Sequence, residues 1–258
     1  MKSRKSKNHP LPTKLVSPLR LPGPDLNTLD TALATLGIRL FGIDGELSSA
    51  AYPIGQDLER TLLYAAVDLS LGKNARLFSL LASWIHVHGD RVLIEKLARL
   101  RTAFENDTGD DAPWLKALAY FAVDCGFNRW KLLAHPANEK HVLPPTALTN
   151  AFVKAKGRVK WLPTSSKLVI ARDTVRIRAE DVLTVPELAR QNRQYRNRWK
   201  YGACLRADIV TEVEIGSVAP YRIAKKLCCT YEPARRIVAE LLLAKEAESS
   251  QAIVNDEV

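Results

Sequence analysis

Three short stretches of helical periodicity, separated by residues that stop and start helices, constrain the fold of the last third of the chain. The first stretch, residues 207–215, stops at Gly216. Pro220 suits the first turn of the second stretch. Thr230 is a preferred cap residue ahead of the third stretch, which extends to about Ala244. The sequence therefore predicts three short helices joined by tight turns.

The apolar residues of the second and third stretches have the spacing of a helix-turn-helix motif. These positions are Ile223, Leu227, Ala234 and Ile237. They would fill the wedge between two crossing helices, and Ala224 falls where a larger side chain would clash. In this motif the last helix lies in the major groove of DNA, with its N-terminal residues facing the base edges. We therefore expect a helix-turn-helix fold over residues 220–244.

One position departs from the usual pattern of the motif. The turn residue after Leu227 is commonly glycine, and here it is Cys228. A non-glycine residue with positive φ is uncommon, so we expect a strained or reshaped turn. The residues after Leu243 become acidic, which predicts at most a rudimentary wing.

The outward face of the motif supplies the first group of candidate DNA contacts. They are Lys225, Lys226, Thr230, Tyr231, Glu232, Arg235 and Arg236. The two arginines can bond bidentately to guanine or clamp phosphates. Lys225, Lys226 and Thr230 are better placed for phosphates, which position a protein on DNA without reading its sequence. Glu232 can accept from cytosine or cap its own helix. An ordinary three-helix packing unit with solvated charges is the alternative.

A second group lies on the helix that precedes the motif. Thr184 and Glu187 form a capping box, which predicts a helix to about Lys200. This helix carries Arg193, Arg196, Arg198 and Lys200 among Asn, Gln, Tyr and Trp residues. Such groups contact phosphates and sugars. Alternatively, Tyr195 and Trp199 pack in the core while the arginines face water.

Charge is distributed unevenly along the chain. The formal net charge is +10, and residues 151–206 carry 14 lysines and arginines against 4 acidic residues. A localised basic stretch is typical of a protein that binds a polyanion, although a generally basic surface would give the same count. Residues 1–24 are basic and proline-rich and predict a flexible arm, whereas residues 246–258 form an acidic tail.

The rest of the chain predicts two domains. Residues 25–140 contain helical patterns that begin near Asp57, Asn74, Asp90 and Pro113, and predict a helical domain for partner binding or self-association. After a linker over residues 135–150, alternating residues between 158 and 178 predict a small antiparallel β-sheet. The expected fold is mainly α with this small sheet: an N-terminal helical domain, then a (winged-)helix-turn-helix domain over residues 145–245.

Four segments together resemble bacterial proteins of two-gene defence loci. They are Gln194–Arg198, Tyr201–Ala203, Arg206–Ile209 and Tyr231–Arg236. In those loci a helix-turn-helix protein accompanies a nucleotidyltransferase-like toxin of the AbiE type. The resemblance implies a transcriptional regulator or antitoxin that binds its own operator and restrains the toxin. The order of parts differs, because antitoxins of that group place the motif nearer the N-terminus.

Features of enzymes are sparse. His86 and His88 form an H-x-H pair, but they fall at a helix end, where a histidine favours the macrodipole. Asp107, Asp110 and Asp111 could form a metal-binding carboxylate cluster, but a solvated loop is the favoured interpretation. No phosphate-binding loop, Gly-x-Ser-x-Gly or His-Glu-x-x-His motif occurs, and none of the four cysteines forms a C-x-x-C pair. We expect no catalysis, no cofactor and no metal.

We therefore expect a cytoplasmic helix-turn-helix protein that binds double-stranded DNA, as a regulator or antitoxin in antiviral defence. No apolar run reaches the length of a membrane span, and a homodimer would match paired half-sites. The alternative is a non-catalytic protein-interaction module that neutralises or scaffolds a partner without binding DNA.

Overall fold

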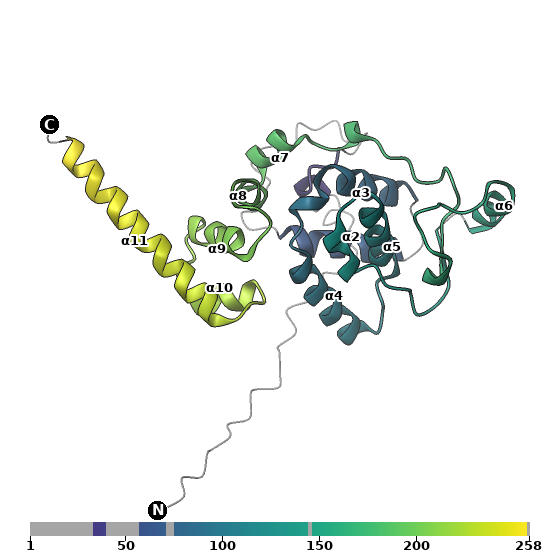
Figure 1. Cartoon of the computed structure of the whole chain (residues 1–258), viewed down its shortest axis with the longest axis horizontal. Coiled ribbons are helices and arrows are strands. Elements are labelled where there is room, and N and C mark those ends of the chain that lie inside the picture. The colour runs from purple at the N-terminus through teal and green to yellow at the C-terminus, as the bar shows by residue number, and fades with distance from the viewer. Residues whose placement is uncertain (1–32, 40–56, 71–74, 144–145, 257–258) are drawn as a thin grey trace, which may run out of the picture.

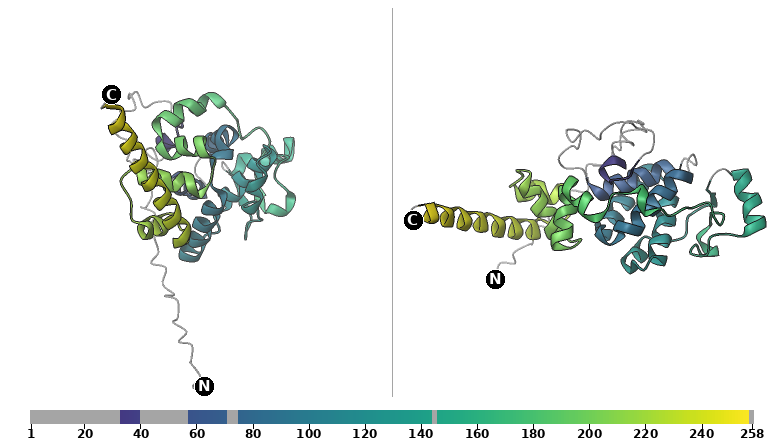
Figure 2. Two further views of the ribbon diagram at one scale, coloured as in Figure 1. Left: turned by 60° about the vertical axis from the view of Figure 1, so that its left-hand side comes forward. Right: turned by 90° about the horizontal axis from the view of Figure 1, so that it is seen from above.

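A computed structural model describes residues 33–39, 57–70, 75–143 and 146–256, and the chain is mainly helical, as the sequence predicts. The molecule is elongated (Figures 1 and 2). Helix α6 (Thr146–Lys156) lies toward one end of its long axis, and α11 (Tyr231–Asp256) projects from the other. The arm expected over residues 1–24 lies outside the described residues. No helix in the described part of the chain is both long and apolar enough to cross a bilayer.

Four helices form the centre of the molecule: α2 (Leu58–Ser70), α3 (Ala75–His88), α4 (Ile94–Thr108) and α5 (Pro113–Asp124). Their starts follow the sequence closely. The Asp57 carboxylate accepts from the backbone amides of Glu59 and Arg60 at 3.1 and 3.2 Å, and so caps α2. Pro113 takes the first position of α5, where its missing N–H costs nothing.

The start of α4 differs from the prediction. Asp90, expected to cap this helix, instead lies in the 3₁₀ turn η1 (Gly89–Arg91). Helix α4 begins three residues later, after Leu93, which has no capping side chain of its own. The Glu59 carboxylate on α2 accepts from the Leu93 amide at 2.9 Å. A residue from another helix therefore does the capping.

The small sheet is parallel, and the antiparallel sheet expected between residues 158 and 178 is wrong. Strand β1 (His141–Val142) pairs with β2 (Leu168–Val169), so one strand comes from the predicted linker. The only antiparallel contact of residues 158–178 is an isolated bridge between Arg158 and Ala171 among the residues described. Helix α6 begins in the predicted linker and continues to Lys156, and Gly157, at φ +82°, closes it as a C-terminal glycine commonly does.

The alternating segment 174–178 forms no strand, and its backbone bonds to a helix. The backbone amides of Arg176 and Arg178 donate to the hydroxyls of Ser79 and Ser83 on α3, at 3.3 and 3.0 Å. Period-2 alternation predicts a strand here, but Thr174 and Val175 lie in bends, and the alternation does not identify the acceptor of the backbone hydrogen bonds. Here serine side chains replace a neighbouring strand.

The single helix predicted from Thr184 to Lys200 is two helices, α7 (Val185–Gln191) and α8 (Arg193–Tyr201). The capping box is present, with the Thr184 amide donating to Glu187 Oε2 at 2.7 Å. Asn192 leaves the helical region, at φ −111° and ψ 112°, and its side chain accepts from the Tyr195 amide at 2.9 Å. An asparagine therefore ends one helix and caps the next.

The described residues bury two separate hydrophobic cores. The main core extends from Leu33 to Tyr195 and includes both the central helices and the segment 158–195. The second core belongs to α9 (Leu205–Glu214), α10 (Pro220–Lys226) and the first half of α11, which we call the three-helix unit. The break between the cores thus falls near residue 205, well after the boundary expected at residues 140–145.

A buried cluster of charges joins the three-helix unit to the main core. Its members are Asp57, Glu59, Lys96, Arg198 and Asp208, from α2 and its cap, α4, α8 and α9. The Arg198 guanidinium is fully buried between two carboxylates: it donates bidentately to Asp208, with both bonds at 2.8 Å, and also bonds both oxygens of Glu59. Lys96 Nζ lies 2.6 Å from Asp57 and 3.2 Å from both Glu59 and Asp208.

Mutual compensation keeps Lys96 and Asp57 charged although both are buried. Burial alone would lower the pKa of Lys96, but the surrounding carboxylates raise it above its ordinary value. Burial would likewise raise the pKa of Asp57, and the Lys96 ammonium lowers it instead. Removing one member of such a cluster leaves its partners charged and uncompensated, which is the costly way to disrupt a buried ion pair.

We predict that Arg198→Met lowers the free energy of unfolding by about 3–5 kcal/mol, because Glu59 and Asp208 lose the buried cation that bonds both of them and keep only Lys96. The matched control is Arg196→Met on the same helix, whose side chain is half exposed and should cost less than about 1 kcal/mol. Urea unfolding of both variants measures the difference. Equal losses would show that the cluster does not hold the two cores together.

A second buried contact joins α3 to α8. His88 Nε2 lies 3.0 Å from the Leu183 carbonyl, which only accepts, so this nitrogen carries the proton. His88 Nδ1 then accepts from the Tyr195 hydroxyl at 2.7 Å. Burial, against the raising effect of the Leu183 bond and with a further contribution from Arg91, lowers the pKa of His88 to about 4. The imidazole is therefore neutral at physiological pH.

This depressed pKa makes stability depend on pH. The unfolded chain binds a proton at His88 near pH 6.5, and the folded chain only near pH 4. The stabilisation is complete above pH 6.5 and is lost as the pH falls toward 4. We predict a loss of about 2 kcal/mol between pH 7 and 5. His88→Gln should abolish this slope in urea unfolding, whereas the exposed His86→Gln should retain it; the reverse pattern would disprove the assignment.

Candidate nucleic-acid interface

The three-helix unit has the core that the sequence predicts for it. Its buried side chains are Ile209, Val213, Ile223, Ala224, Leu227, Ala234, Ile237 and Val238. Helix α11 packs against both α10 and α9. The apolar side of α11 is therefore buried within its own unit, and the opposite side is free to carry other contacts.

The turn between α10 and α11 is a Schellman motif with cysteine in the glycine position. The Cys229 amide donates to the Ala224 carbonyl at 3.0 Å, and the Cys228 amide to the Lys225 carbonyl at 3.4 Å. Cys228 has φ +53°, so the turn keeps the geometry usual for glycine, as the sequence suggested. Arg99 on α4 donates to the Cys228 carbonyl at 2.5 Å.

Packing accounts for a cysteine at this strained position. The Cys228 side chain is partly buried and packs against the main core. A glycine would relieve the backbone but would remove this contact. Together with the Arg99 bond, Cys228 fixes the turn of the three-helix unit against α4.

The N-terminal half of α11 exposes the residues predicted to face DNA. Tyr231 is 50% exposed, and the side chains of Arg235 and Arg236 are 57% and 73% exposed. Glu232 and Thr230 are also exposed. Since Ala234 and Ile237 on the same helix are buried, the two faces of α11 are clearly distinguished.

Acidic neighbours orient the arginines of this face. Arg235 binds Glu232 bidentately, at 2.7 and 3.1 Å, and this bond lowers the pKa of Glu232. Arg236 lies 3.9 Å from Glu240, which also binds Arg206 at 2.7 Å. Such exposed ion pairs contribute at most about 1 kcal/mol, so a stronger anionic ligand can displace them.

The remaining residues of the first group lie on or beside α10. Lys225 and Lys226 are exposed, and Lys226 reaches Glu212 on α9 at 2.7 Å. Sequence reasoning did not include Tyr221 or Arg222, which lie in the first turn of α10 and are exposed, Tyr221 by 69%. Their position after Pro220, at the start of a helix in this motif, is the signal that could have identified them.

Three of the four candidates on α8 are exposed. Arg193 and Arg196 both approach Glu214 at the end of α9, at 4.0 and 3.4 Å. Lys200 lies 5.0 Å from the centre of the Tyr201 ring. Helix α9 contacts both α8 and α11. The alternative reading is correct for Tyr195, which is buried, but wrong for Trp199, which is 53% exposed.

Arg198 is wrong as a DNA contact. Its side chain is completely buried in the charge cluster that joins the two cores. The count of basic residues on α8 could not reveal this, because the partners Glu59 and Asp208 lie on other helices. On its own helix, Arg198 is one basic residue in a basic run.

The C-terminal end of α11 also differs from the prediction. The helix continues to Asp256, well beyond the limit predicted near Ala244. Residues 231–256 therefore form no wing hairpin, and the start of the predicted acidic tail belongs to the helix. Within the described ranges, no three His, Cys, Asp or Glu side chains are arranged to hold a metal ion.

Comparisons with protein-family models, with curated proteins and with solved structures gave no match to this chain. The candidate interface is therefore described from the residues of this chain alone. It is an exposed basic and aromatic face on a helix whose other face is buried.

The strained turn gives a prediction about stability. We expect Cys228→Val to lower the free energy of unfolding by about 1–3 kcal/mol more than Cys228→Gly, because a β-branched side chain tolerates positive φ poorly. Urea unfolding of both variants measures this difference. If valine and glycine prove equally stable, the turn does not hold residue 228 in the left-handed region.

Proposed function

We propose that the three-helix unit binds double-stranded DNA as a helix-turn-helix, with the N-terminal half of α11 in the major groove. One observation carries the proposal: α11 turns Tyr231, Arg235 and Arg236 outward while its opposite side is buried in the core of the unit. An α-helix fits the major groove, and arginine pairs bidentately with guanine there.

The bidentate bond between Arg235 and Glu232 supports this role. It holds the guanidinium extended and exposed, which reduces the conformational freedom lost on binding. Contact with a guanine edge or a phosphate would replace the exposed bond to Glu232. The released carboxylate then faces the groove, where it can accept from the amino group of cytosine.

Neighbouring cations complete the proposed interface. Lys225 and Arg222 on α10, and Thr230 before α11, lie close in sequence to the reading helix and would contact phosphates. Arg193 and Arg196 on α8 are both close to Glu214. They would add phosphate contacts only if the bound DNA reached beyond this carboxylate. Arg198 takes no part, because it is buried.

As the biological role, we propose a transcriptional regulator or antitoxin of a defence locus, with a nucleotidyltransferase-like toxin as partner. The resemblance of segments on α8, α9 and α11 to such proteins supports this role. A protein-binding module is the second candidate, and it is favoured by the exposed apolar side chains Val218, Tyr221 and Leu243 on the same unit.

DNA affinity should depend steeply on salt. If about four phosphates are neutralised, binding of a mixed-sequence duplex should weaken about 100-fold between 50 and 200 mM NaCl. Arg235→Glu with Arg236→Glu should abolish binding. The control Lys131→Glu with Lys160→Glu makes the same charge change at exposed sites outside the unit and should retain most of the affinity. Fluorescence anisotropy of a labelled duplex measures all three.

Two outcomes would contradict the proposal. Equal loss in both double variants would mean that bulk charge, and not the α11 face, attracts DNA. No binding at 50 mM NaCl, or a flat salt response, would favour the protein-binding module.

A further inference from the structure

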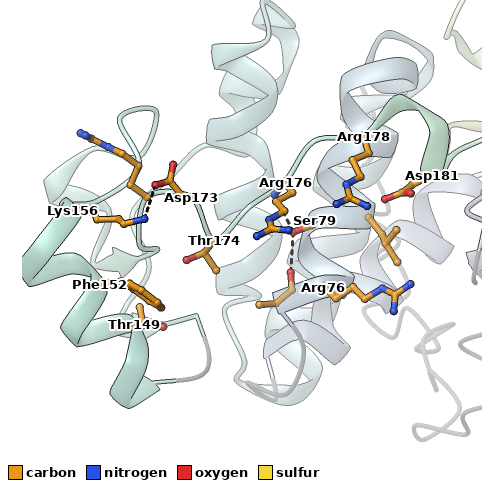
Figure 3. A pocket seen from close by; sticks show the side chains of 13 residues that line it. Arg76, Ser79, Thr149, Phe152, Lys156, Asp173, Thr174, Arg176, Arg178 and Asp181 are labelled. Carbon is orange, nitrogen blue, oxygen red and sulfur yellow. Dashed lines mark hydrogen bonds and ion pairs between the residues drawn. The ribbon is translucent and has the colours of Figure 1, made fainter.

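A basic cavity lies far from the three-helix unit. It has a volume of about 540 Å³ and lies between α3, α6 and the segment 172–181 (Figure 3). Five of the side chains that line it are basic: Arg76, Lys156, Arg172, Arg176 and Arg178. Two are acidic, Asp173 and Asp181. The excess of positive charge indicates an anionic ligand.

The segment 174–178 presents two of these arginines on one side. Thr174, Arg176 and Arg178 line the cavity, whereas Val175 packs against the main core, so alternate side chains of the segment face the cavity. Their backbone amides bond to Ser79 and Ser83 on α3. The arginines are therefore held by a rigid helix even though their own segment has no regular structure.

The arginines that line the cavity have no acidic partner among the described residues, unlike several arginines on or beside the three-helix unit. Among the described residues, no carboxylate oxygen lies within 4.0 Å of a guanidinium nitrogen of Arg76, Arg172, Arg176 or Arg178. Lys156 alone is paired, with Asp173 at 3.3 Å. By contrast, Arg193, Arg206 and Arg235 each have an acidic partner. The cavity thus gathers four arginines that have no acidic partner in the part of the chain that the structure describes.

The end of the cavity formed by α6 offers apolar surface beside the Lys156–Asp173 ion pair. Phe152 on α6 is 46% exposed, and Figure 3 shows its ring beside Thr149 on the side where Lys156 lies. Thr149 is buried and its hydroxyl donates to the Leu143 carbonyl at 2.6 Å, so it offers mainly its methyl group. Leu80 of α3 also lines the cavity. An exposed ring and aliphatic surface can receive a planar, weakly polar group.

We propose that this cavity binds a nucleotide, with its phosphates on Arg176, Arg178 and Arg76 and its base against Phe152. The volume lies in the range of small-molecule sites, roughly 300–1,000 Å³. Arginine forms bidentate, charge-assisted bonds with phosphate, and aromatic rings stack on bases. The site is independent of the proposed DNA interface, because no residue is shared between them.

The test is isothermal titration of the full chain at 150 mM NaCl with ADP and with pyrophosphate. ADP should bind with one site per chain and more tightly than pyrophosphate. Arg176→Ala with Arg178→Ala should weaken both ligands at least tenfold; neither substitution alters the backbone amides that bond to α3. Phe152→Ala should weaken ADP at least fivefold and leave pyrophosphate unchanged.

Arg235→Ala with Arg236→Ala is the matched control, since it removes the same charge from the three-helix unit and should bind ADP as the unaltered chain does. Absence of ADP binding, or equal weakening in the two double variants, would overturn the proposal. A single-stranded dT8 oligonucleotide that displaces ADP at a tenfold lower concentration would also overturn it, because the occupant would then be a nucleic-acid backbone. None of these results depends on whether the three-helix unit binds DNA.

Discussion

The Arg198 guanidinium, held between Glu59 and Asp208 without access to water, is the interaction on which the arrangement of this molecule depends. It connects a helix of the main core to the first helix of the three-helix unit. Desolvating charges is expensive, so such a cluster persists only when every member has a partner at short range. The charged groups must therefore lie at hydrogen-bonding distance and in the right orientation, whereas hydrophobic contact alone would allow the helices to shift relative to one another. The cluster therefore specifies where the three-helix unit sits, beyond any contribution to stability.

The turn at Cys228 and the contact between His88 and Tyr195 also connect the C-terminal helices to the main core. Arg99 on α4 bonds to the Cys228 carbonyl, so the turn that separates α10 from α11 is attached to the main core. His88 on α3 attaches α8 in the same way. The three-helix unit that carries the proposed reading helix is thus attached to the main core by these side-chain contacts. A change in the central helices would be transmitted to α11 through a few identifiable bonds.

Local signals in the sequence predicted most of the helices and the wedge of the three-helix unit. Caps, prolines and apolar spacing depend on residues within about ten positions, and Asp57, Pro113 and the Thr184 capping box act at that range. Two of the errors involve partners far away in the chain. The acceptors for segment 174–178 are serines about 95 residues earlier, and the ligands of Arg198 lie on other helices. Side-chain type does not reveal such partners.

The basic block at residues 151–206 shows why a charge count along a sequence does not locate a surface. In the structure this block is divided among three environments. Arg198 is buried and neutralised, Arg193 and Arg196 share Glu214 at the surface, and Arg176 and Arg178 line a cavity toward the opposite end of the molecule. Arg172, Arg176 and Arg178 of this block have no acidic partner among the described residues, and all three line the cavity. The excess that first indicated a polyanion ligand for the last helices therefore argues at least as strongly for a second, smaller anion bound elsewhere.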